Sequence, residues 1–131
     1  MKPENIKFKA KRLDDNSWVF GYFYEENGIT YIIENRQEES KLNRNITYQV
    51  NPETVCQFTG LKDCEGKEVW EGDIVEREIW NKLYNGLTKV KGVIEYKGAE
   101  FFVAINSETY SLYSKDIKVV GNKFDKKEGE K

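Results

Sequence analysis

The chain has 131 residues, which fits one compact domain or two small modules that share a core. Its 38% hydrophobic and 14% aromatic residues are enough to build such a core, so the composition argues against a wholly disordered protein. A net charge of -2 gives no global basic field and disfavours non-specific nucleic-acid binding. The lack of histidine excludes Ser-His-Asp catalysis, Cys-His catalysis and histidine-ligated metals.

No segment has the pattern of a membrane span or a signal peptide. The apolar runs fall well short of the ~20 residues that cross a bilayer, and the start, Met1 to Arg12, is polar and basic. Cys56 and Cys64 are the only cysteines, too few for a disulfide scaffold or a four-thiolate zinc site. We therefore expect a cytoplasmic protein with reduced thiols and no membrane association.

The start of the chain predicts three strands. Lysines alternate with apolar residues over Ile6 to Leu13, the period of a strand with one buried face. Aromatic and β-branched residues predict strands over Trp18 to Tyr24 and Ile29 to Glu34. Asn27-Gly28 between them suits a type I′ turn, whose two central residues need positive φ. Gly21 is expected to mark a bulge or a close backbone contact.

The middle of the chain predicts a loop, a strand and a turn. Asn35 to Asn45 lacks apolar periodicity and predicts a mobile loop. Ile46 to Val50 regains strand character, and Asn51-Pro52-Glu53 predicts a turn because proline fixes φ. We place a module boundary after Val50.

The remainder predicts a small barrel. Short β-type segments are separated by turn residues such as Asn85-Gly86 and Lys97-Gly98, and closely spaced short strands favour closure. The predicted strands are Thr54 to Thr59, Glu68 to Trp70, Ile74 to Trp80, Thr88 to Tyr96, Glu100 to Ile105, Thr109 to Tyr113 and Ile117 to Val120.

The predicted fold class is therefore all-β. An N-terminal antiparallel β module spans residues 1–50, a C-terminal barrel spans 51–122, and a disordered charged tail spans 123–131. Alternation within the barrel strands predicts a single core. Its expected members are Val55, Phe58, Leu61, Val69, Ile74, Val93, Ile94, Phe102, Val119 and Val120.

The stretch from Val50 to Val75, VNPETVCQFTGLKDCEGKEVWEGDIV, closely resembles the signature of the YopX family of phage and prophage proteins, which carry a TGLKD-x-x-GKE-x-x-EGDIV type run. Shorter matches at Ile6 to Ala10, Gly92 to Ile94 and Val119 to Asn122 extend the resemblance over nearly the whole chain. It implies an N-terminal β region followed by an SH3-like barrel, in a phage protein within the bacterial host cytoplasm. Both cysteines depart from the signature, so the resemblance assigns neither thiol a function.

Three glycine turns are expected to define the fold. Gly60, Gly66 and Gly72 lie at reversals between extended segments, where glycine adopts positive φ without strain. Asp73 is expected to accept local backbone hydrogen bonds. With Glu71 it could instead form a carboxylate pair or a cation site, but no cleft is predicted there. We predict no catalytic residue, no metal site and no cofactor.

A predicted long loop from Asn81 to Leu87 displays apolar side chains among polar ones, as interaction surfaces do. Lysines on the next predicted strand add local positive charge. The loop could bury itself against the N-terminal module or against another chain. The candidate interaction surface comprises Trp80, Leu83, Tyr84, Leu87, Lys89 and Lys91.

Aromatic residues gather in the N-terminal strands beside basic ones. Exposed rings flanked by cations suit single-stranded nucleic acid, because bases stack on the rings. We favour the alternative that alternate rings fill the core while the lysines protect an edge strand. The rings are Trp18, Phe20, Tyr22, Phe23, Tyr24 and Tyr31, and the lysines are Lys7, Lys9 and Lys11.

The sequence thus favours a phage or prophage accessory protein that is not an enzyme and acts by binding protein. The expected contact is self-association as a dimer, since symmetric dimers are the commonest oligomers, or a host or phage protein. The alternative is a nucleic-acid-binding module in phage replication or regulation. Steep salt dependence through counterion release would distinguish nucleic-acid binding from an apolar interface.

Overall fold

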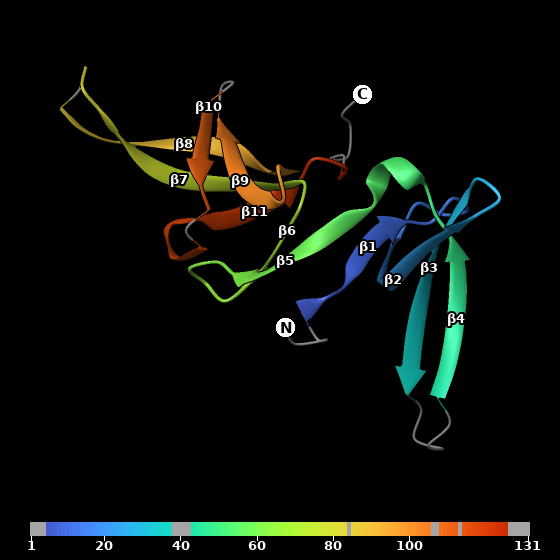
Figure 1. Cartoon of the computed structure of the whole chain (residues 1–131). Coiled ribbons are helices and arrows are strands. Elements are labelled where there is room, and N and C mark those ends of the chain that lie inside the picture. Colours follow the sequence, from blue (N-terminus) through green and yellow to red (C-terminus); the bar gives the residue numbers. More distant parts are fainter. Residues whose placement is uncertain (1–4, 38–42, 84, 106–107, 113, 126–131) are drawn as a thin grey trace. The chain divides into compact units, whose positions relative to one another are not determined.

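The computed structural model describes residues 5–37, 43–83, 85–105, 108–112 and 114–125 and shows an all-β protein (Figure 1). The chain forms two compact units, residues 1–58 and 59–131. The elements in chain order are β1 (Phe8–Lys11), β2 (Trp18–Glu26), β3 (Ile29–Gln37), β4 (Asn43–Gln49), the 3₁₀ helix η2 (Pro52–Thr54), β5 (Cys56–Lys62), β6 (Glu68–Trp70), β7 (Asp73–Asn81), β8 (Gly86–Lys97), β9 (Glu100–Ile105), β10 (Glu108–Ser111), the 3₁₀ helix η3 (Ser114–Asp116) and β11 (Lys118–Asn122).

The first unit is built on an antiparallel sheet with strand order β4-β3-β2-β1-β5. The β2–β3 hairpin turns at Asn27 and Gly28, whose φ angles are 54° and 79°. Both angles are positive, so the predicted turn is confirmed. β1 is an internal strand, paired with β2 on one side and β5 on the other, so the expectation that its lysines protect an edge is wrong.

Gly21 marks a close backbone contact, as its place within a strand predicted. Its φ is 157°, and a Cβ atom built there would lie 2.0 Å from the carbonyl oxygen of Ile33. Only a residue without a side chain allows β2 and β3 to approach this closely.

The described residues of the predicted loop over Asn35 to Asn45 are strand. β3 continues to Gln37 and β4 begins at Asn43, with pairs from Asn35↔Asn45 to Gln37↔Asn43. Residues 38–42 lie outside the described residues. The periodicity of apolar side chains did not predict this extension, because hydrogen bonds between the backbones of paired strands form whatever the side chains are.

The core of the first unit is small. Ala10, Val19, Ile32 and Val50 are buried, with Phe8, Tyr48 and Val55 packed against them. The segment 50–55 after β4 supplies two of these side chains. It is held by backbone hydrogen bonds from Asn51 N to Lys11 O (2.9 Å) and from Val50 N to Thr30 O (3.0 Å).

The two units divide between Phe58 and Thr59 rather than after Val50. The start of β5 belongs to the first unit because it pairs with β1, with Phe8 opposite Gln57 and Lys9 opposite Cys56. β5 then runs on into the second unit, where its neighbour is β6. A strand shared by two units hides the boundary from sequence composition.

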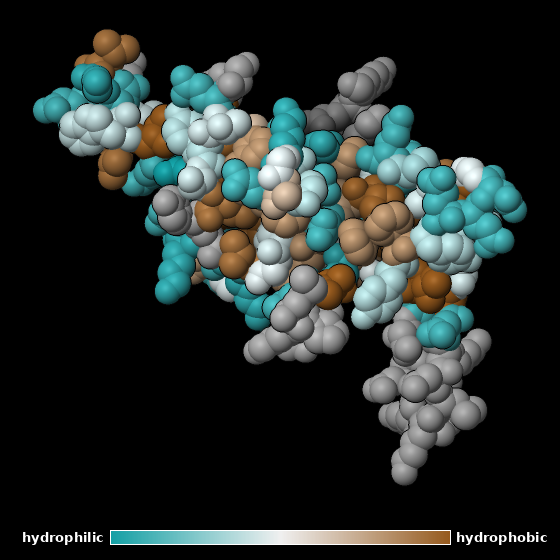
Figure 2. All heavy atoms as spheres, viewed as in Figure 1, coloured by the Kyte–Doolittle hydropathy of each residue, from teal (hydrophilic) through white to brown (hydrophobic). Residues whose placement is uncertain are grey.

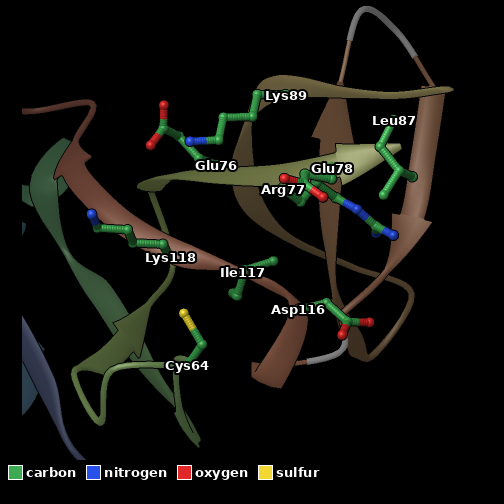
Figure 3. Close-up of a pocket in the computed structure, with 9 residues that line it drawn as sticks. All are labelled: Cys64, Glu76, Arg77, Glu78, Leu87, Lys89, Asp116, Ile117 and Lys118. Atoms are coloured by element: carbon green, nitrogen blue, oxygen red, sulfur yellow. The ribbon is translucent and has the colours of Figure 1, made fainter. Parts of the chain in front are cut away.

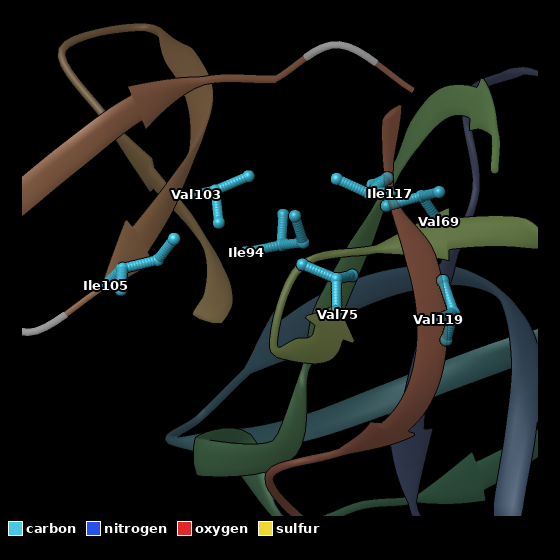
Figure 4. Close-up of a cluster of buried hydrophobic side chains, with 7 residues drawn as sticks. All are labelled: Val69, Val75, Ile94, Val103, Ile105, Ile117 and Val119. Carbon is cyan, nitrogen blue, oxygen red and sulfur yellow. The ribbon is translucent and has the colours of Figure 1, made fainter. Parts of the chain in front are cut away.

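The second unit is built on an antiparallel sheet with strand order β10-β9-β8-β7-β11. Among the described residues no pairing joins β10 to β11, so this sheet is open at both edges. Side chains from β6, β7, β8, β9 and β11 meet on one face of it (Figure 4). The buried cluster comprises Val69, Val75, Ile94, Val103, Ile105, Ile117 and Val119.

The expectation of one core for the ten predicted residues is wrong. Phe58, Val69, Ile94 and Val119 are buried, but Phe58 belongs to the first unit. Leu61 and Val120 are exposed, at 38% and 41%. Val55, Ile74, Val93 and Phe102 are half-buried. Ile74 and Val93 are register partners on the face opposite Val75 and Ile94, so the prediction combined residues of both faces.

Residues 123 and 124, the first two of the predicted disordered tail, make hydrogen bonds. Lys123 N donates to Gly72 O at 2.9 Å, and Phe124 N donates to Asn122 Oδ1 at 2.9 Å. Residues 126–131 lie outside the described residues. Within the described ranges, no helix has the length and apolar character to span a membrane.

Candidate functional site

The predicted loop between Asn81 and Leu87 is a hairpin end. β7 and β8 pair continuously from Ile74↔Val93 to Asn81↔Gly86, which leaves a short turn. The turn is shaped by Leu83 N, which donates to Asn81 Oδ1 at 2.9 Å, and by Asn85 with φ of 49°. The long-loop prediction was therefore wrong, and the candidate surface lies mainly on paired strands.

Register places most of the candidate residues on one face of this hairpin. Opposed residues of an antiparallel pair point to the same side, and successive residues alternate. Trp80, Leu87, Lys89 and Lys91 therefore share a face with Glu76 and Glu78. The three cross-strand pairs are Glu76↔Lys91, Glu78↔Lys89 and Trp80↔Leu87. We call these six residues the outer face of the hairpin.

The opposite face of the hairpin explains why the outer face is solvated. Val75 and Ile94 point into the core cluster of the second unit, and Gly92 lies directly opposite Val75 in the register. A Cβ atom at Gly92 would lie 2.7 Å from both Val103 Cγ1 and Ile105 Cγ1. Because that face is filled by the core, the alternate residues face solvent.

The end of the outer face is apolar and exposed. Trp80 is 57% exposed, Leu87 is 64% exposed, and Leu83 in the turn is 90% exposed. Figure 2 shows hydrophobic side chains beside hydrophilic ones at the end of the β7–β8 hairpin. Tyr84, the remaining candidate, lies outside the described residues. Clustered apolar exposure of this kind is typical of interaction sites.

A cavity of about 490 Å³ opens beside the outer face. Side chains of β7, β8 and β11 surround it together with Cys64 (Figure 3). Its lining residues are Cys64, Glu76, Arg77, Glu78, Leu87, Lys89, Asp116, Ile117 and Lys118. Carboxylates and cations are mixed around it, so the cavity offers no field of one sign for a polyphosphate. Among the described residues, no three His, Cys, Asp or Glu side chains are grouped to hold a metal.

Arg77 lies at the inner side of this region. Its Nε atom is buried and has no hydrogen-bond partner among the described residues, and its guanidinium lies 5.4 Å from the ring centroid of Tyr110. The Tyr110 hydroxyl donates to Glu108 Oε2 at 2.8 Å, which raises the pKa of Tyr110. These contacts fix β10 against β7 and give Arg77 a packing role.

Comparison with known families decides the relationship of the chain. The family model described as YopX protein matches residues 7–128. The chain belongs to the YopX family. A comparison with curated proteins found no match.

The YopX signature stretch folds into the turns of the second unit. Gly60, Gly66 and Gly72 have φ angles of 85°, 82° and 85°. Asp73 is buried, and its carboxylate accepts from Trp70 N at 2.8 Å and from Asn122 Nδ2 at 3.0 Å. These bonds give Asp73 a structural role in the signature. The segment Glu71-Gly72-Asp73 has the geometry expected of a turn that leads into a strand.

Asp63 is a second signature residue with a structural part, which sequence analysis did not single out. Its Oδ1 accepts from Glu65 N and Lys67 N, both at 2.9 Å, and its Oδ2 accepts from Val119 N at 2.8 Å. Burial alone would raise the pKa of Asp63, but these N–H groups and the charge of Lys67 outweigh it, so the pKa lies below its ordinary value. An aspartate before a glycine turn predicts hydrogen bonds to nearby backbone groups. The hydrogen bond from Val119 of β11 could not be predicted in this way, because Val119 is distant in the sequence.

The N-terminal aromatic residues of this YopX chain are more exposed than predicted. Phe20, Tyr22 and Tyr24 are 47%, 51% and 36% exposed, so alternate rings do not fill the core. Lys9 Nζ and Lys11 Nζ lie 4.6 Å and 5.3 Å from the ring centroid of Trp18. Both lysines are buried, and their ammonium groups lie over the ring.

Proposed function

We propose that this YopX protein is a non-enzymatic binding module that associates with a second copy of itself through the outer face of the β7–β8 hairpin. The observation that carries the proposal is the exposed apolar pair Trp80 and Leu87, side by side on opposed strands. Tryptophan is among the residues most enriched at the centres of interfaces. An exposed ring on paired strands loses less conformational freedom when it docks than a ring on an unpaired loop.

The hairpin provides the support that such an anchor needs. Its inner face is fixed by Val75 and Ile94 in the core cluster, so the outer face is held by packed elements. Charged residues on the same face form a rim next to the apolar pair. An apolar centre with a polar rim is the usual anatomy of a protein interface.

The direct test of this surface is Trp80→Ala. Removal of a central interface tryptophan should weaken self-association by about 2 kcal/mol or more, seen as a shift of the dimer midpoint in light scattering across a concentration series. Leu13→Ala is the matched control, because Leu13 is also exposed, at 55%, but lies in the first unit. Equal behaviour of the two variants would contradict the proposal.

We further propose that the second unit is an SH3-like barrel. Four strands, β7 to β10, form a meander, η3 follows, and β11 returns to pair with β7. This winding brings the last strand beside the first, as a small barrel requires. The resemblance to YopX proteins supports the same architecture.

The proposed setting is the cytoplasm of a bacterial host during phage or prophage activity. Family membership supports the phage association. The lack of histidine supports the absence of catalysis, because acid–base work near neutral pH would need another residue with a strongly shifted pKa. A host or phage protein is the alternative occupant of the outer face.

A second candidate function is single-stranded nucleic-acid binding by the first unit. The exposed rings of Phe20, Tyr22 and Tyr24, on one face of β2, favour it because bases stack on such rings. The burial of Lys9 and Lys11 against Trp18 weakens it. Titration of labelled single-stranded DNA and RNA at 50 mM and 200 mM salt tests it, and affinity that falls steeply with salt would support it.

A further inference from the structure

We infer that the outer face of the hairpin is self-complementary in charge. Two copies then pair face to face. The two-fold axis lies in the interface between the two outer faces and runs parallel to β7 and β8. This inference deepens the proposed self-association and rests on it. It adds the partner's orientation and the residues that select it.

The outer face carries two columns of opposite sign. β7 contributes Glu76 and Glu78, and β8 contributes Lys91 and Lys89. The register places Glu76 level with Lys91 and Glu78 level with Lys89, with Trp80 level with Leu87 beyond them. The β7 column is therefore acidic at the first two levels, and the β8 column is basic there. Both columns are apolar at the third level.

A two-fold axis parallel to the strands exchanges the columns without changing the levels. Glu78 of one copy then faces the partner's Lys89, and Glu76 faces the partner's Lys91. At the third level Trp80 faces the partner's Leu87, so apolar groups also meet. Every level of the face finds a complementary group, as an isologous contact requires.

The second possible two-fold axis in the plane of the interface would bring like charges together. A two-fold axis perpendicular to the strands would keep each column over itself and reverse the levels. Glu78 would then face the partner's Glu78, and Trp80 would face the partner's Glu76. Like charges and a buried carboxylate beside a ring make this orientation unfavourable.

The balance of charge also favours a second copy over other partners. Two glutamates and two lysines cancel on the six-residue face, so it has no net attraction for nucleic acid or for a strongly acidic peptide. The adjoining cavity is lined in part by Glu78, Leu87 and Lys89. Leu87, the residue that faces the partner's Trp80 in this arrangement, is one of these lining residues.

Paired charge reversals test the inference on the full chain. At the level of residues 78 and 89, Glu78→Lys makes both columns basic and Lys89→Glu makes both columns acidic. Each variant alone should lose dimer, with the dissociation constant raised at least about tenfold, because like charges then face each other. An equimolar mixture of the two variants should regain the dimer, since each lysine at this level then faces a glutamate of the partner. Native mass spectrometry with one variant isotope-labelled identifies the heterodimer.

The mixture separates contact between copies from effects inside one chain, because each chain keeps its own like-charged pair at residues 78 and 89. Two controls accompany it. The double variant Glu78→Lys with Lys89→Glu should restore the homodimer. Glu25→Lys, an exposed glutamate of β2, should leave the native dissociation constant unchanged. If circular dichroism shows that a charge-reversal variant does not fold, Glu76→Lys and Lys91→Glu make the same test at the neighbouring cross-strand pair.

The outcomes distinguish this inference from the function on which it rests. A native chain that stays monomeric defeats both. A native dimer that Trp80→Ala dissociates, with no heterodimer in the mixture, overturns the axis and leaves self-association standing. Heterodimer in the mixture together with loss of both homodimers establishes the inferred orientation.

Discussion

Asp63 connects two distant parts of the second unit through backbone hydrogen bonds. Its two carboxylate oxygens serve the turn after β5 on one side and Val119 of β11 on the other. A carboxylate that accepts three N–H groups is favoured in its charged form. At the scale of single residues, this aspartate is the strongest reason for the TGLKD part of the signature.

Asp63→Asn should destabilise the second unit by about 2 kcal/mol. The amide retains one acceptor oxygen, but its NH₂ group would face a backbone donor, so a buried N–H loses its partner. Urea denaturation of both proteins at neutral pH measures the difference. A change below about 0.5 kcal/mol would contradict the role given to this carboxylate.

The same contribution has a defined pH dependence. The folded pKa of Asp63 lies below its ordinary value of 3.8, so the contribution is fully present above that ordinary value and is lost as pH falls through the folded pKa. The stability difference between the native chain and Asp63→Asn should therefore be constant near neutrality and shrink in acid. A difference that grows on acidification would refute this assignment.

Gly72→Val should destabilise the fold by about 1 to 3 kcal/mol, because a β-branched residue is strained at a φ of 85°. Gly121→Val is the matched control, since Gly121 lacks a positive φ and a Cβ atom there meets nothing within 4 Å. Thermal melting compares the two. Equal melting temperatures would remove Gly72 from the fold-defining turns.

At the scale of elements, the β7–β8 hairpin shows what alternation reveals and what it hides. Both faces of these strands carry β-branched residues: Ile74 beside Val75, and Val93 beside Ile94. Alternation shows that neighbours face opposite ways, but a strand with apolar residues on both faces does not identify the core face. Register and burial settle it for Val75 and Ile94.

Truncation of the two faces should therefore have unequal effects. Ile94→Ala removes a fully buried side chain and should cost about 2 to 5 kcal/mol. Ile74→Ala removes a half-buried one and should cost roughly half as much, since the effect scales with apolar area. Denaturation midpoints measure both. A larger effect at Ile74 would reverse the assignment of faces.

At the scale of the whole molecule, local patterns located the strands, and the signature located the family. Every predicted strand has a counterpart, and the Asn27-Gly28 turn has its predicted φ signs. Non-local relations were beyond the sequence. β1 is internal only because β5 pairs with it from more than forty residues away, and the outer face exists only through the β7–β8 register.

The candidate surface was recovered in part for the same reason. Trp80 and Leu87 were identified as apolar residues outside a core, and the structure places them together at the hairpin end. Glu76 and Glu78 were not part of the predicted surface. Their alignment with Lys91 and Lys89 emerges from the pairing, because opposed residues are distant in the chain.

Self-association of the full chain is the central claim, and sedimentation equilibrium over a concentration series tests it most directly. The predicted result is a mass that rises from one chain of 15.4 kDa towards twice that value as concentration increases through the micromolar range. Trp80→Ala should shift this rise to higher concentration. A native mass that remains at one chain well above micromolar concentration would contradict the account.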